Sequence, residues 1–119
     1  MISARSTLTL ALLILATPAF PHAFLARANP PVGSVLPASP PSVTITYTEG
    51  VEPGFSTIEV RDSHGTRVDK ADLHLTGNEG KQLSVSLPKL SAGQYTVIWH
   101  VTSVDTHKTD GQFNFSVSP

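Results

Sequence analysis

Apolar residues recur at every second position in five short segments of this chain, and this alternation limits the possible fold more than any other feature. A period of two is typical of β-strands with one buried face, because successive side chains point to opposite sides of a sheet. No segment has a convincing amphipathic helical period, so we expect an all-β fold. The alternating residues are Val43, Ile45 and Tyr47; Ile58 and Val60; Leu83, Val85 and Leu87; Tyr95, Val97, Trp99 and Val101; and Phe113, Phe115 and Val117.

The segments between these strands favour a two-layer architecture. An edge strand around residues 24–28 and a short strand near residues 73–75 would bring the total to about seven. Prolines concentrate in residues 29–41, which favours extended backbone and turns over helix, and residues 62–65 are typical of a hairpin turn. Short strands at this spacing predict an immunoglobulin-like Greek-key sandwich or barrel, with Trp99 in its core.

The N-terminus has the pattern of a secretory signal peptide. Residues 1–21 combine Arg5 as the only charge, an apolar stretch over residues 8–16 and an exit of small residues. The apolar stretch is too short to anchor the chain in a bilayer. We therefore predict a cleaved leader over residues 1–21 and one exported domain over residues 22–119.

The position of the cut decides what chemistry the mature N-terminus offers. A cut before His22 would give one residue with two metal-binding nitrogens, its free α-amine and its ring. This cut places Pro21 at position −1 and Ala19 at −3, although signal peptidase favours small residues at both. Cleavage after Ala19 would leave an overhang before His22, and cleavage after Ala23 would remove the histidine.

Charge and sulfur content exclude several kinds of partner. The chain of 119 residues has a formal net charge of −1 at pH 7, and without a basic face we expect no nucleic-acid partner. It has no cysteine, and Met1 is its only methionine, which excludes cysteine-based zinc sites and soft sulfur ligands for Cu(I). The following acidic residues are expected on a solvated surface: Glu52, Glu59, Asp62, Asp69 and Asp72.

Asp105 and His107 are the best candidates for further metal ligands. In extended backbone, residues two apart point to the same side. With the amine and ring of His22 they would supply three nitrogens and one oxygen, a set that suits tetragonal Cu(II). The alternative is that both are solvated loop residues, with Asp105 in a turn hydrogen bond.

Several segments together resemble the CopC family of periplasmic copper-resistance proteins. They are HAFL at 22–25, ANPPVGSVL at 28–36, VTITYTE at 43–49, GQYTVIW at 93–99, SVDTH at 103–107 and GQFNF at 111–115. The resemblance covers nearly all of residues 22–119 and keeps the order and spacing of the segments. It implies a Greek-key β-barrel or sandwich.

The resemblance also implies one Cu(II) per chain, held by His22, Asp105 and His107. Glu49 would lie near the ion as a weak axial or supporting group, and Ser103 would support the loop. The chain lacks the methionine-rich loop of family members with a Cu(I) site, so it resembles the Cu(II)-only branch. The implied partner is an inner-membrane copper transport protein of the CopD type.

We predict a monomeric, non-enzymatic protein that sequesters copper or delivers it to a partner. Two other functions remain as alternatives. One is a copper monooxygenase, because some of these enzymes also use an N-terminal histidine. The other is a metal-free immunoglobulin-like structural or adhesion module. The remaining histidines, His64, His74 and His100, are expected to face solvent without a metal.

Overall fold

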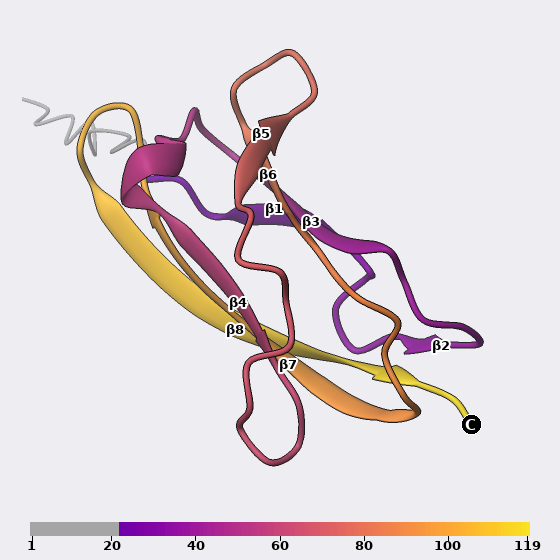
Figure 1. Ribbon diagram of the computed structural model, residues 1–119. Helices are drawn as coiled ribbons and strands as arrows, with labels where there is room; N and C mark the ends of the chain where they lie inside the picture. The colour runs from indigo at the N-terminus through magenta and orange to yellow at the C-terminus, as the bar shows by residue number, and fades with distance from the viewer. Residues whose placement is uncertain (1–21) are drawn as a thin grey trace, which may run out of the picture.

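The computed structural model describes residues 22–119 as two four-stranded β-sheets that pack face to face (Figure 1). One sheet has the strand order β1-β3-β6-β5, and the other has the order β2-β8-β7-β4. The elements are β1 (Leu25–Asn29), β2 (Val35–Leu36), β3 (Ser42–Tyr47), the 3-10 turn η1 (Pro53–Phe55), β4 (Thr57–Arg61), β5 (His74–Thr76), β6 (Gln82–Ser86), β7 (Gly93–Thr102) and β8 (Lys108–Val117). The predicted all-β sandwich is confirmed.

A long antiparallel hairpin of β7 and β8 carries the candidate site at its tip. The two strands pair from Gly93 with Val117 to Thr102 with Lys108. Each strand has ten residues, so the hairpin spans about 30 Å. The loop between these strands lies at one end of the sandwich, and Figure 1 shows it at the upper left, near the indigo start of the described chain.

The core consists of the residues that the alternation predicted, together with a few from the connecting segments. Trp99 lies between the sheets as expected, with its ring edge-on to Tyr47 and 5.3 Å between the ring centroids. Gly111 is the cross-strand partner of Trp99, and the indole fills the space that a side chain at this position would need. The core cluster contains Ala23, Val43, Ile45, Tyr47, Val51, Ile58, Val60, Leu83, Val85, Leu87, Leu90, Tyr95, Val97, Trp99, Val101, Phe113, Phe115 and Val117.

Two details of the expected strands differ in the structure. Residues 22–119 form eight strands rather than about seven, because Val35 and Leu36 in the proline-rich segment pair in parallel with the end of β8. Leu87 was expected in a strand but follows the end of β6. It is nevertheless buried, and its N–H donates to the Pro41 carbonyl at 2.9 Å. Long-range pairing determines both details, so the local period could not indicate them.

Asp69 does not belong to the solvated acidic surface that we expected. Its side chain is completely shielded from solvent, and its carboxylate accepts hydrogen bonds from Arg67 and from the backbone N–H groups of Val60 and Ala71. Burial by itself would raise the pKa of Asp69, but these donors lower that pKa overall. The buried carboxylate therefore remains charged and fastens the segment after β4 to that strand.

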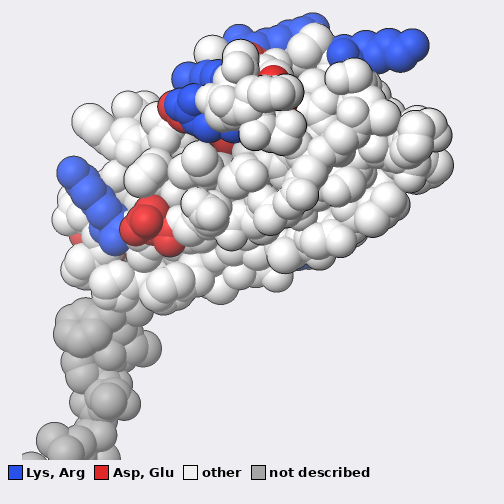
Figure 2. Space-filling model, turned by 90° about the horizontal axis from the view of Figure 1, so that it is seen from below, with Lys and Arg blue, Asp and Glu red and all other residues white. Residues whose placement is uncertain are grey.

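The predicted signal peptide, residues 1–21, lies outside the described residues. Within residues 22–119, no helix has the length and hydrophobicity of a membrane span. On the face seen in Figure 2, the Lys and Arg side chains are scattered, and acidic side chains lie beside several of them. This face therefore has no continuous basic patch.

Candidate metal centre

The loop between β7 and β8 is a compact turn with a defined position. The Ser103 N–H donates to the His107 carbonyl at 2.8 Å, and the Thr106 N–H donates to the Ser103 carbonyl at 2.9 Å. The Val104 N–H donates to the Gly50 carbonyl at 3.0 Å, which joins the loop to the segment after β3. Both sheets therefore position the side chains of this loop.

Asp105 and His107 are neighbours in this turn. Oδ2 of Asp105 lies 3.2 Å from Nδ1 of His107. Ser103 is 1% exposed, and its hydroxyl donates a hydrogen bond to the Asp105 carboxylate. This bond, together with the adjacent His107, holds the pKa of Asp105 below its ordinary value. The carboxylate is therefore anionic at neutral pH, as a metal ligand must be.

The reason for this proximity differs from the one that we predicted. We expected extended backbone with both side chains on one side of a strand, but Thr106 between them has a positive φ of 73°. The backbone turns at this residue, and the turn brings the two side chains together. Asp105 and His107 keep 33% and 43% of their side-chain surface exposed, so an ion from solvent can reach them.

The start of the described chain crosses the end of the sandwich and reaches the same loop. The ring of His22 stacks on the ring of His107, with 4.6 Å between the centroids and 24° between the planes. It also stacks on Phe24 at 5.8 Å. The three predicted ligand side chains thus lie together at one end of the sandwich, although His22 is more than 80 residues away in the sequence from Asp105 and His107.

Glu49 lies between the two parts of this cluster. The hydroxyl of the preceding Thr48 donates to the His22 carbonyl at 3.1 Å, and the carbonyl of the following Gly50 accepts from Val104 in the loop. Glu49 itself is half-buried. It is therefore held next to both His22 and the β7–β8 loop.

The cluster is not yet a coordination site. Across residues 22–119, no three His, Asp or Glu side chains converge in a way that could hold a metal ion. Imidazole binds a metal through a nitrogen in the ring plane, whereas the rings of His22 and His107 lie face to face. The nitrogen of His22 is also a peptide amide in the full-length chain, bonded to Pro21. The donor types suit Cu(II), but the α-amine of His22 becomes available as a further nitrogen donor only if the chain is cut directly before this residue.

Sequence reasoning missed two residues that hold His22 in place. Thr48 bonds the His22 carbonyl, and the hydroxyl of Thr109 on β8 donates to the Ala23 carbonyl. Threonine on a strand is too common to indicate such a role, and both contacts join residues that are far apart in the sequence. No local pattern could have identified them.

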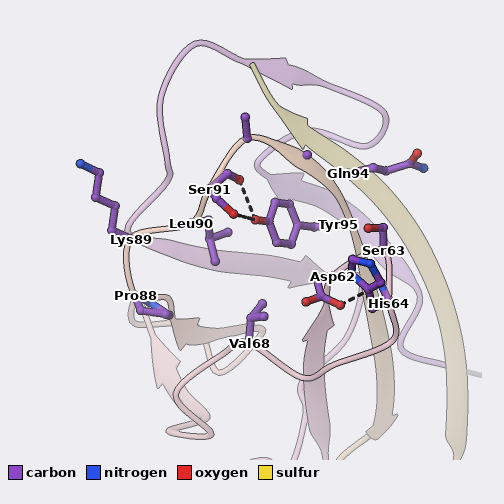
Figure 3. Close-up of a pocket in the computed structure, with 12 residues that line it drawn as sticks. Asp62, Ser63, His64, Val68, Pro88, Lys89, Leu90, Ser91, Gln94 and Tyr95 are labelled. Atoms are coloured by element: carbon purple, nitrogen blue, oxygen red, sulfur yellow. Dashed lines mark hydrogen bonds between the residues drawn. The ribbon is translucent and has the colours of Figure 1, made fainter. Parts of the chain in front are cut away.

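The histidines that we did not assign to the site are all exposed, as expected: His64, His74 and His100. His64 borders a cleft at the other end of the hairpin (Figure 3). Two polar side chains of this cleft are bonded to the backbone. The Tyr95 hydroxyl donates to the Ser91 carbonyl at 2.6 Å, and the Asp62 carboxylate accepts from the N–H groups of His64 and Thr66. Among residues 22–119, no three His, Asp or Glu side chains gather in this cleft in a way that could hold a metal ion.

The fold and the cluster define a class of protein, a small β-sandwich domain that presents imidazole and carboxylate ligands at one end. The CopC domain family model matches residues 25–118. The chain therefore belongs to the CopC family. One relative, copper resistance protein C of Xanthomonas campestris pv. juglandis, is 30% identical, and the match covers 83% of this chain and 82% of that protein.

Relatives cover the chain almost completely. Protein YobA of Escherichia coli (strain K12) is 37% identical over 117 residues, which are 97% of this chain and 94% of YobA. Copper transport protein CutJ of Bacillus subtilis (strain 168) is 33% identical over 92% of this chain, but the match covers 20% of CutJ. The crystal structure of CopC from Methylosinus trichosporium OB3b superposes with a TM-score of 0.78 at 34% identity, covering 82% of this chain and 95% of that one.

Proposed function

We propose that this protein, after removal of residues 1–21, is a periplasmic protein that binds one Cu(II) ion per chain. The ligands are the α-amine and ring of His22, the carboxylate of Asp105 and the ring of His107. Glu49 is the proposed weak axial or supporting group, because its neighbours Thr48 and Gly50 bond His22 and the β7–β8 loop. This set of three nitrogens and one oxygen contains no sulfur, which favours Cu(II) over Cu(I).

One observation carries the proposal: the His22 ring lies against the His107 ring at 4.6 Å, and Asp105 lies 3.2 Å from His107. This contact brings a histidine at the start of the described chain to the Asp–His pair in the β7–β8 loop, at an exposed end of the sandwich. Ser103 donates a hydrogen bond to the Asp105 carboxylate and would support the site.

The burial of Ala23 supports a cut before this residue. Ala23 is 0% exposed, and its carbonyl accepts from Thr109. Cleavage after Ala23 would remove a core residue and leave the Thr109 hydroxyl without this partner. Cleavage before His22 keeps both contacts and frees the amine.

The proposed role is sequestration of Cu(II) or its delivery to a membrane copper transport partner of the CopD type. The match to a small part of the copper transport protein CutJ supports such a partner, because there a similar domain is joined to a much longer chain. We propose a monomer with a binding role rather than an enzymatic one. An anionic Asp105 ligand stabilises Cu(II) against reduction and occupies a position that oxygen needs in a copper monooxygenase.

The test is a competition titration of protein that begins at His22 against a Cu(II) chelator of known affinity. We expect one tight Cu(II) per chain and an electron paramagnetic resonance spectrum of tetragonal, mixed nitrogen and oxygen ligation. Two tight ions per chain, or sulfur-like charge-transfer bands, would contradict the ligand set. Failure to bind copper would favour the metal-free structural module, and peroxide production with ascorbate would favour the monooxygenase.

A further inference from the structure

Hydroxyl groups from both sheets hold the segment that carries His22. At the end of β3, Thr48 makes two side-chain hydrogen bonds: its hydroxyl donates to the His22 carbonyl at 3.1 Å and accepts from the Phe24 N–H at 3.0 Å. The Thr48 N–H also donates to the Phe24 carbonyl at 2.8 Å. From the other sheet, Thr109 donates its hydroxyl to the Ala23 carbonyl.

The residue between these contacts is fixed by packing. Ala23 is 0% exposed and belongs to the core cluster, so its methyl group faces the space between the two sheets. Three consecutive residues are therefore held, His22 through its carbonyl, Ala23 through its side chain and carbonyl, and Phe24 through its N–H and carbonyl. The backbone of residues 22–24 is therefore held against the body of the domain.

We propose that Thr48 and Thr109 are positioning residues that hold the N-terminal segment so that His22 lies against His107 before any metal binds. This inference rests on the proposed copper function, and it concerns two residues that are not among the proposed copper ligands. Without the two hydroxyls, the segment would populate detached states in which His22 is remote from the loop. Apparent affinity falls with the fraction of molecules in the binding-competent state.

The test compares Thr48→Val, which removes the hydroxyl at nearly constant shape, with Thr48→Ser, which keeps it. Both variants begin at His22. In the metal-free protein, Thr48→Val should speed hydrogen exchange at the Phe24 amide and increase the backbone mobility of residues 22–24 by nuclear magnetic resonance. It should also weaken Cu(II) binding by roughly three- to tenfold, the factor that corresponds to one net protein hydrogen bond. Thr48→Ser should restore both properties.

Thr109→Val provides an independent test from the opposite sheet. It should weaken Cu(II) binding by roughly threefold, with Thr109→Ser as its matched control. If Thr48→Val does not fold, the mobility and affinity of the Thr109→Val protein still decide the proposal. Unchanged affinity in folded Thr48→Val and Thr109→Val proteins would overturn it, even if the segment became more mobile.

A His22→Ala background separates positioning from a general effect on the fold. This background also carries a methionine before residue 22, so that both the ring and the free α-amine of that residue are lost; the remaining ligands are then in the β7–β8 loop, and Thr48→Val should no longer change the Cu(II) affinity. An equal loss in both backgrounds would mean that Thr48 acts through the body of the domain, which would overturn the proposal. Loss of the proposed function has a different signature, because then the protein that begins at His22 would itself fail to bind copper.

Discussion

Replacement of Gly111 by alanine should destabilise the domain because this position has no space for a side chain. A Cβ atom at residue 111 would lie 2.6 Å from Cζ2 and 2.9 Å from Cε2 of Trp99. Both distances are well inside van der Waals contact. The indole cannot easily move away, because Trp99 is 5% exposed and packs edge-on against Tyr47.

The expected cost follows from this overlap. Insertion of one extra carbon into a well-packed core typically costs about 1–3 kcal/mol. In a domain of this size, each kcal/mol lowers the melting temperature by about 4–8 °C, so Gly111→Ala should melt roughly 4–24 °C below the wild type. Thermal unfolding followed by circular dichroism measures this shift. The emission of Trp99, the only tryptophan in the chain, reports on the contact directly.

Gly54→Ala is the matched control. The added Cβ at residue 54 meets no heavy atom within 4 Å, and Gly54 does not have a positive φ. The free energy of unfolding of the Gly54→Ala protein should therefore stay within about 0.5 kcal/mol of the wild-type value or rise slightly. Trp99→Phe should reduce the penalty of Gly111→Ala, because phenylalanine lacks the second ring of the indole. A Gly111→Ala protein with the melting temperature and emission maximum of the wild type would refute the packing argument.

Three further predictions concern the metal site and acid stability. Protein that starts with Met before His22 should bind Cu(II) roughly tenfold more weakly, or worse, than protein that starts at His22. The reason is that loss of a group that merely orients a ligand already costs 10–100-fold in metal affinity. Equal affinities in a chelator competition would remove the amine from the ligand set. His107→Ala should weaken Cu(II) binding to at least the same extent without loss of fold. His64→Ala should leave the Cu(II) affinity unchanged. Equal effects of the two substitutions in the same titration would mean that the site is misassigned. Asp69→Asn should cost about 1–3 kcal/mol at neutral pH because the charged bond from Arg67 is lost. The folded-state pKa of Asp69 is lowered, so its contribution is present above the ordinary pKa of aspartate and is lost as the pH falls through the folded value. When thermal unfolding is measured from neutral pH to about pH 2, the melting temperature of Asp69→Asn should therefore fall less than that of the wild type. Parallel curves of melting temperature against pH would contradict this.

Local sequence pattern was sufficient to predict most of the strands and most of the core. The alternation around Val97, Trp99 and Val101 shows which side chains face inward, because side-chain direction in a strand depends only on the parity of the position. The candidate ligand types were also predicted from the sequence. Imidazole and carboxylate without sulfur limit the metals that the domain can prefer, whatever its fold.

Tertiary structure alone decided which distant residues meet. Val35 and Leu36 form a strand because the end of β8 is available to pair with them, and nothing in their own sequence indicates this. The Asp105–His107 pair arises from a turn at Thr106 rather than from an extended strand. His22 meets His107 where Thr48, directly after β3, bonds the His22 carbonyl and Thr109 on β8 bonds the Ala23 carbonyl. The physical reason is that strand period is a property of a few consecutive residues, whereas strand pairing and side-chain bonds between sheets depend on how the whole chain packs.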